Sequence, residues 1–416
     1  MARTLLLKYA ETGTLYSAWR WQDVPAQAEA AKLDAQYLEQ VQTALTQCLP
    51  EPQADESGDA ALERALTTGW LAQPQTAFQL GGGLGDSLIP AEIAGALRTE
   101  RERGTRPRLR IQVSPSTARV PWPLLRIGPE REPLLELADL EFAPPASLAA
   151  SARPINHRGD SVVAVIDPRV PGASPTSALG SVLGRPQQDD ALAALLRHGV
   201  RLRPEAKNYL ELVRRRDLDE RWLREQLADA ARFLYVGHAT NSENADAGAG
   251  AALHLAGAGP HVPVTAAQLV RDAWQFPARC ALIACGSASD LRDLEPMGLT
   301  LAALSCGAEL VTATSWRLPT DAAMALFAGA SSDRQPLREL VLAVDLAHDS
   351  RDPVTALGDW QRERLRAWDA HGDGGDSPLV WASAVTYTRG GGVDRRFNLF
   401  GPSQAISVDR KQQERL

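Results

Sequence analysis

The chain from about residue 155 to residue 400 alternates short apolar runs with segments of helical periodicity. The apolar runs cover 161–166 (SVVAVI), 233–237 (FLYVG), 280–284 (CALIA) and 309–313, and a last strand is predicted over 380–387. Helical patterns fall between and after them, over 190–198, 218–231, 265–274, 299–306, 321–327, 336–348 and 356–368. Strands that are apolar on both faces are typical of parallel sheets covered by helices on each side. The alternation therefore predicts an α/β three-layer sandwich with a mostly parallel central sheet.

The first 154 residues have a different pattern, which predicts a smaller α+β region. Strand patterns cover 4–21 and 109–113, and helical patterns cover 24–48, 60–71 and 89–102. The glycine-rich run 81–85 is interpreted as a turn, because it does not have the spacing of a dinucleotide-binding loop. The proline-rich stretch 144–154 and the polar run after it mark the domain boundary. We predict an N-terminal region over 1–154, a main domain over 155–405 and a polar tail over 406–416.

Composition and charge narrow the class of protein. Of the 416 residues, 44% are hydrophobic and 23% are charged, which is typical of a folded globular chain. The net charge of −7 argues against a general nucleic-acid binder. The arginine run 214–216 is followed closely by Asp217 and Asp219, so we expect a solvated charged face there.

The sequence shows no targeting signal, and together with its cysteines this predicts a cytosolic protein. The N-terminus has only a three-leucine apolar run before charge returns, and no apolar stretch approaches 18 residues. The sequence therefore predicts a cytoplasmic protein without a membrane partner. Its four cysteines, at 48, 280, 285 and 306, match neither a disulfide framework nor a zinc-binding spacing, so we expect free thiols.

Two of the predicted strands are followed directly by candidate catalytic residues. The run 233–237 is followed by His238, and the run 280–284 is followed by Cys285. If these strands are parallel neighbours, both side chains leave the sheet at the same edge. A thiol beside an imidazole is the minimum set for a cysteine nucleophile and its base. The separation, 285 − 238 = 47 residues, is close to the ~50 residues of the caspase signature.

The residues around this pair resemble the CHAT domain, a caspase-like peptidase domain, over about 161–401. The strings 235–239 (YVGHA) and 282–288 (LIACGSA) are similar to its histidine and cysteine elements. Further similar strings cover 298–304 (GLTLAAL), 313–316 (ATSW), 377–382 (SPLVWA) and, upstream, 118–125 (ARVPWPLL). The usual tetratricopeptide repeats are not found before the domain.

The resemblance implies a caspase-like fold and a cysteine endopeptidase that needs no cofactor or metal. Cys285 would attack the scissile carbonyl, and His238 would serve as base and acid. The backbone N–H groups of Ala239 and Cys285 would form the oxyanion hole. The implied partner is a protein substrate, for example a gasdermin-like pore former in bacterial defence or cell death, and the family leaves room for a protein activator.

Two residues depart from the patterns of related peptidases. Ala239 stands where the family has glycine, and alanine fits there only if the backbone avoids positive φ. Ile283 stands where caspases have a glutamine that helps to hold an acidic P1 side chain, so aspartate specificity is not expected.

Other interpretations of the same residues remain open. A catalytically silent scaffold of caspase-like fold is the main alternative, and a nucleotide-binding α/β enzyme is a weaker one because no phosphate loop is present. Cys280 and Cys306 are interpreted as buried packing residues, and Cys48 as a structural or surface residue. His254 and His261 lack further ligands at zinc spacing and are interpreted as loop histidines near a substrate cleft.

Overall fold

The structure is a computed structural model of the chain. It describes residues 2–12, 14–33, 35–174, 177–197, 199–240, 250–257, 259–284, 296–331 and 333–390. Among these residues, no helix has the length and apolar character that crossing a membrane requires.

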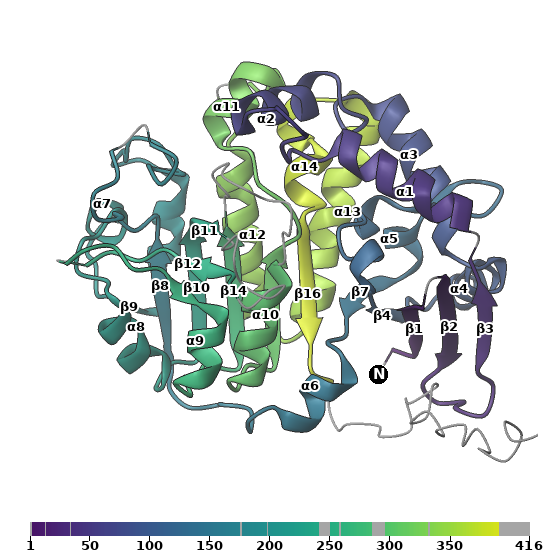
Figure 1. The fold of residues 1–416 in the computed structure, drawn as a ribbon, viewed down its shortest axis with the longest axis horizontal. Helices are drawn as coiled ribbons and strands as arrows, with labels where there is room; N and C mark the ends of the chain where they lie inside the picture. Colours follow the sequence, from purple (N-terminus) through teal and green to yellow (C-terminus); the bar gives the residue numbers. More distant parts are fainter. Residues whose placement is uncertain are drawn as a thin grey trace, which may run out of the picture.

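One sheet of eleven strands runs through the molecule (Figure 1). Its order is β3-β2-β1-β4-β7-β16-β15-β14-β10-β8-β9. The bounds are β1 Thr4–Glu11, β2 Leu15–Trp21, β3 Glu29–Lys32, β4 Arg108–Gln112, β7 Asp139–Phe142, β8 Ser161–Ile166, β9 Arg201–Arg203, β10 Arg232–Gly237, β14 Arg279–Ala284, β15 Leu310–Thr314 and β16 Ala384–Thr388.

The second half of the sheet has the predicted α/β architecture. Strands β9, β8, β10, β14 and β15 are parallel, and β16 pairs antiparallel with β15. The helices α8 (Glu220–Leu227), α9 (Ala266–Arg271) and α10 (Pro296–Ser305) lie on one face of these strands (Figure 1). The opposite face is covered by α12 (Pro336–Asp349), which contacts β10, β14 and the 3₁₀ helix η3 (Ala191–Leu196). The fold-class prediction is confirmed.

The first half begins with a hairpin, a parallel strand pair and the helices between them. β1 pairs antiparallel with β2 and parallel with β4. The helices are α1 (Ala35–Cys48), α2 (Gly58–Thr67), α3 (Pro74–Leu88) and α4 (Ala91–Glu102). The helix predicted over 24–48 is wrong in its first part, because 29–32 form the edge strand β3 against β2. Edge pairing therefore overrides the helical composition of this segment.

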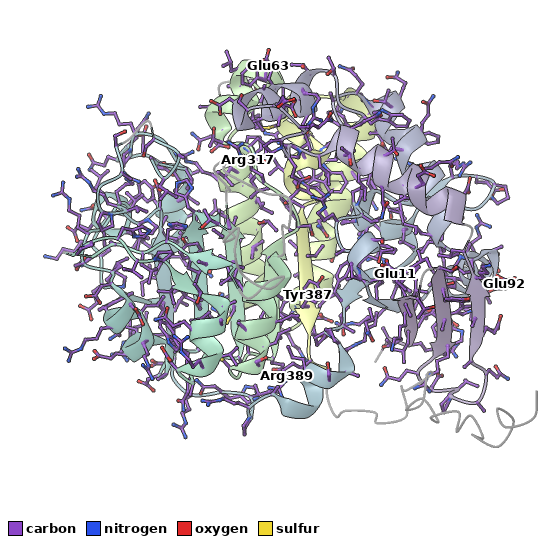
Figure 2. The ribbon with its side chains drawn as sticks, viewed as in Figure 1. Glu11, Glu63, Glu92, Arg317, Tyr387 and Arg389 are labelled. Carbon is purple, nitrogen blue, oxygen red and sulfur yellow. The ribbon has the colours of Figure 1, made fainter. Side chains whose placement is uncertain are left out.

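The two halves of the sheet meet where β16 lies beside β7, at the pair Tyr387–Phe142. Figure 2 shows Tyr387 near the middle of the molecule. Beside this pair the buried carboxylate of Glu141 accepts hydrogen bonds from Arg108 at 3.0 Å, from Arg110 at 2.6 Å and from the Thr388 hydroxyl. Charge-assisted hydrogen bonds of this kind are stronger than neutral ones. They supplement the short backbone pairing at the junction.

The turn predicted at 81–85 is wrong, because all five residues lie inside α3. Two of the glycines, Gly81 and Gly85, are required by packing. A Cβ atom at Gly85 would lie 1.9 Å from the Arg126 carbonyl oxygen, and one at Gly81 would lie 2.4 Å from that of Leu124. The helix therefore packs directly against the backbone of the segment that follows Trp122.

We expect Gly85→Ala to lower the free energy of unfolding by about 1–3 kcal/mol, the usual cost of overpacking. Gly83→Ala is the matched control, since a Cβ at Gly83 meets nothing within 4 Å. The control should be neutral or stabilising by up to ~1 kcal/mol, because alanine favours helix more than glycine does. Urea denaturation of both variants measures the difference, and equal stabilities would refute close helix packing at Gly85.

Candidate functional site

The strands that precede the two candidate catalytic residues are neighbours and end at the same level. β10 and β14 are parallel, and their last paired residues are Gly237 and Ala284. His238 follows Gly237, and Cys285 follows Ala284 in the sequence. Cys285 itself, including its backbone N–H, lies outside the described residues. The two strands are therefore parallel neighbours, as the sequence analysis required for both residues to follow the same edge of the sheet. Figure 1 shows the two strands side by side.

His238 is held in a buried position, and its Nε2 atom is hydrogen-bonded. Its exposure is 6%, and its Nε2 atom lies 2.8 Å from the carbonyl oxygen of Gly180. Since a carbonyl oxygen only accepts hydrogen bonds, Nε2 carries the proton in this contact. In the neutral ring the basic lone pair is then on Nδ1, which is the atom that can take up a proton.

The backbone of His238 is fixed by a buried tyrosine from its own strand. The Tyr235 hydroxyl lies 2.6 Å from the His238 carbonyl oxygen and 2.9 Å from the His254 carbonyl oxygen, and it accepts from the His254 N–H at 3.3 Å. Gly237 makes room for this hydroxyl, because a Cβ there would lie 2.8 Å from it. A glycine directly before His238 is therefore required by packing.

Ala239 lies in the two-residue strand β11 (Ala239–Thr240), which pairs with β12 (Ala252–Leu253). It is not among the non-glycine residues with positive φ. Alanine is therefore accommodated at this position without backbone strain. The role of its N–H in an oxyanion hole stays a prediction.

The expectation of a solvated arginine run is wrong for Arg214. Its side chain is 17% exposed and lies 3.2 Å from the carboxylate of Asp167, a residue whose side chain is 1% exposed. Asp167 follows β8 directly, beside the strand that leads into His238. Sequence reasoning missed both Asp167 and Gly180. The one available signal was the polar residue at the end of an apolar strand, the same signal that singled out His238.

His254 and His261 form a pair close to His238. The Nδ1 atom of His254 lies 2.8 Å from Nε2 of His261, and its Nε2 atom lies 2.7 Å from the Thr240 hydroxyl. Burial lowers the pKa of His254 to about 3, and the nearby His261 and His238 act in the same direction. Within the described residues no cluster of three or more histidine, cysteine or acidic side chains is arranged to hold a metal ion.

The three described cysteines are buried and have weakly acidic thiols. Burial, with a smaller effect of Glu51, raises the pKa of Cys48 to about 12. Burial also raises the pKa of Cys306 to about 11 and that of Cys280 well above its usual value. Because the thiolate is the nucleophile, these three side chains are poor candidates for catalysis.

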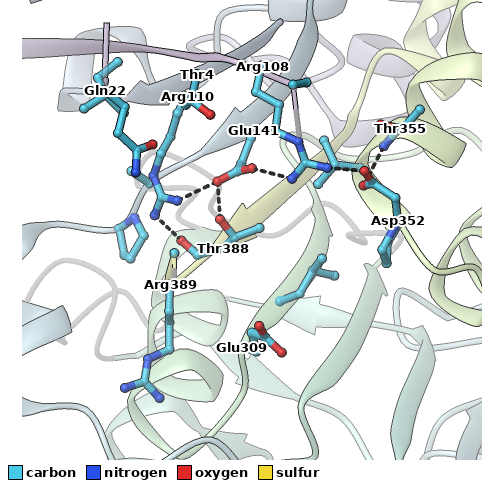
Figure 3. Close-up of a pocket in the computed structure, with 18 of the residues that line it drawn as sticks. Thr4, Gln22, Arg108, Arg110, Glu141, Glu309, Asp352, Thr355, Thr388 and Arg389 are labelled. Carbon is cyan, nitrogen blue, oxygen red and sulfur yellow. Dashed lines mark hydrogen bonds and ion pairs between the residues drawn. The ribbon is translucent and has the colours of Figure 1, made fainter. Parts of the chain in front are cut away.

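A cavity of about 1240 Å³ lies at the other end of the sheet (Figure 3). It is lined by the first residues of several parallel strands, including Arg108, Arg279 and Leu310. His238 follows the last residue of its strand, so this cavity is not part of the candidate site. Figure 3 shows that ionic contacts of Arg108 and Arg110 with Glu141 form one of its walls.

The low pKa of His254 predicts a pH dependence of stability. The folded protein keeps this ring neutral down to about pH 3, whereas an unfolded histidine takes up a proton near pH 6.5. Stability is therefore lost as the pH falls from about 6.5 towards 3. In His254→Gln the slope of unfolding free energy against pH between pH 4 and 6 should shrink by about 1.4 kcal/mol per pH unit. Urea denaturation at several pH values tests this, and an unchanged slope would show that His254 titrates normally.

Comparison with known proteins gives one family and a set of distant structural likenesses. Two crystal structures of the Saccharomyces cerevisiae separase–securin complex align with 92% of this chain at 11% identity, with TM-scores of 0.44 and 0.41. The chain spans 30% of the length of the chains that it matches. No curated protein matches significantly. The family model described as "CHAT domain" matches residues 71–388, which is most of the chain. The chain therefore belongs to the CHAT domain family.

Proposed function

We propose that this protein is a cysteine endopeptidase with Cys285 as nucleophile and His238 as its general base and acid. The observation that carries the proposal is the register of β10 and β14, which ends both strands level at Gly237 and Ala284. The hydrogen bond from His238 Nε2 to the Gly180 carbonyl supports it, because it leaves Nδ1 as the basic nitrogen. The high thiol pKa values of the other three cysteines leave Cys285 as the candidate nucleophile.

In the proposed reaction, the Cys285 thiol transfers its proton to His238 and the thiolate attacks the scissile carbonyl carbon. The tetrahedral oxyanion is stabilised by the N–H groups of Ala239 and Cys285. His238 then gives its proton to the leaving amine as the C–N bond breaks, which produces a thioester. His238 then takes a proton from a water molecule, whose oxygen attacks the thioester carbonyl carbon. The C–S bond breaks, the carboxylic acid product leaves, and His238 returns the proton to the Cys285 thiolate.

The substrate proposed is a specific partner protein whose P1 residue is not selected as in caspases. Ile283, at the position of the caspase glutamine, is 1% exposed and apolar, so it offers no hydrogen bond to an acidic side chain. Membership of the CHAT family supports a role in a bacterial defence or cell-death pathway, with a gasdermin-like pore former as one substrate class and with a protein activator. The proposed location is the cytoplasm, as the sequence analysis predicts. In this proposal residues 155–405 form the peptidase domain, with the N-terminal region 1–154 before it.

Cleavage mapping tests the proposal directly. The purified wild-type protein and Cys285→Ala are incubated with lysate and with the proteins encoded beside this gene, and new N-termini are identified by mass spectrometry. We expect cleavages that occur with the wild type and are reduced to background in Cys285→Ala and in His238→Gln. The residues before the new N-termini then give the P1 preference.

Cys280→Ala is the matched control for this experiment. It makes the same substitution on β14, five positions before the nucleophile, at a buried thiol. Its cleavages should equal those of the wild type. Products that persist in Cys285→Ala would exclude Cys285 as the nucleophile, and the absence of products with every neighbouring protein present would favour the scaffold function.

A further inference from the structure

A buried ionic cluster lies behind His238, on the side of the Gly180 carbonyl. Its centre is Asp167, the residue that follows the last position of β8. The Asp167 side chain is 1% exposed, so its charge is removed from water. A buried carboxylate persists only when it is paired and hydrogen-bonded, which makes its partners informative.

The backbone of Asp167 is tied to the strand that carries His238. Its N–H donates to the carbonyl oxygen of Val236 at 2.6 Å, two residues before His238. Its φ is +48°, a left-handed conformation that is unfavourable for a residue other than glycine. Aspartate adopts this conformation more readily than most side chains, and the contacts around Asp167 hold it there.

The carboxylate of Asp167 binds the two residues that come directly after Gly180. Its Oδ2 atom lies 2.5 Å from the Ser181 hydroxyl, and its Oδ1 atom accepts from the Val182 N–H at 3.2 Å. One side chain on the sheet thus holds the segment that presents the Gly180 carbonyl. Ser181 and Val182 are 14 and 15 residues from Asp167 in the sequence, so these are tertiary contacts. They hold the segment beside the end of β8.

Arg214 links the carboxylate to that carbonyl. Its Nη1 atom lies 3.2 Å from Asp167 Oδ1 and 3.4 Å from the Gly180 oxygen. The same oxygen accepts the hydrogen bond from His238 Nε2 at 2.8 Å. A chain of contacts therefore runs from the Asp167 carboxylate, through Arg214 and the Ser181–Val182 backbone, to the imidazole of His238.

We propose that Asp167 is a positioning residue that fixes the tautomer and orientation of His238 through the Gly180 carbonyl. The effect of Asp167 on activity rests on the proposed peptidase function, whereas its effect on the His238 tautomer does not. A fixed acceptor at Nε2 keeps the proton on that nitrogen, so that Nδ1 stays the base in every turnover. Loss of Asp167 would free the 180–182 segment and allow both tautomers.

The test uses Asp167→Asn, which keeps the shape of the side chain and removes its charge. Selective ¹⁵N labelling of histidine in a Cys285→Ala background reports the tautomer of His238 without a thiol–imidazole ion pair. The His238 signal is assigned by its loss in His238→Gln. We expect the Nε2–H tautomer with Asp167 and a mixture of tautomers in Asp167→Asn. With Cys285 present, kcat for a mapped substrate should fall about ten- to a hundredfold with little change in KM.

Asp345→Asn is the matched control, because Asp345 is also buried and also paired with arginines, Arg197 and Arg232. Arg232 is the first residue of β10, so this ion pair lies at the opposite end of the strand from His238. Asp345→Asn should keep the Nε2–H tautomer and kcat. Ser181→Ala is a milder second variant, to be used if Asp167→Asn fails to fold, and should shift the tautomer in the same direction.

A single Nε2–H tautomer in Asp167→Asn, or in Ser181→Ala if that variant is used, would overturn the inference. So would a wild-type ring with the proton on Nδ1. These outcomes are independent of peptidase activity, because they are measured without the nucleophile. If the tautomer shifts as expected but no substrate is cleaved by any variant, the proposed function fails and the positioning role of Asp167 stands.

Discussion

The parallel pairing of β10 with β14 is the constraint on which the proposed chemistry depends. Six consecutive residue pairs, from Arg232–Arg279 to Gly237–Ala284, set the two strands level along their whole length. A shift of one residue would turn every side chain of one strand to the other face of the sheet. Because both strands are buried, such a shift would be strongly unfavourable, and the positions that follow them are fixed relative to each other.

The surroundings of His238 show how a rigid sheet controls one imidazole ring. From one side the Tyr235 hydroxyl holds the backbone carbonyl of His238, and Gly237 leaves the space that this hydroxyl needs. From the other side the Gly180 carbonyl receives the ring proton. Residues 177–184, which provide this carbonyl, lie outside helices and strands, and the contacts of Asp167 and Arg214 hold them in place. A loop can be precise when a buried ion pair anchors it to the sheet.

The sequence predicted the features that depend on local pattern and failed where tertiary contacts decide. The apolar runs before His238 and Cys285 identified both strands, because a buried parallel strand is apolar at every position. The glycine run of α3 was interpreted as a turn. The contact that requires glycine at position 85 is made with the backbone of Arg126, which lies about 40 residues away in the chain. Arg214 was misread as solvated because its partner, Asp167, is 47 residues earlier. The placement of Cys285 was predicted from sequence, and it lies outside the described residues.

The central claim is that Cys285 and His238 form one acid–base unit, and the pH dependence of Cys285 alkylation tests it most directly. The rate of iodoacetamide labelling at Cys285, followed by peptide mass spectrometry, reports the fraction of thiolate. The account predicts an inflection well below pH ~8.5, the value of a free cysteine, and a shift to about 8.5 or higher in His238→Gln. The buried Cys48, Cys280 and Cys306 should label slowly throughout the range and serve as internal references. An inflection near 8.5 in the wild type that His238→Gln does not move would contradict the account.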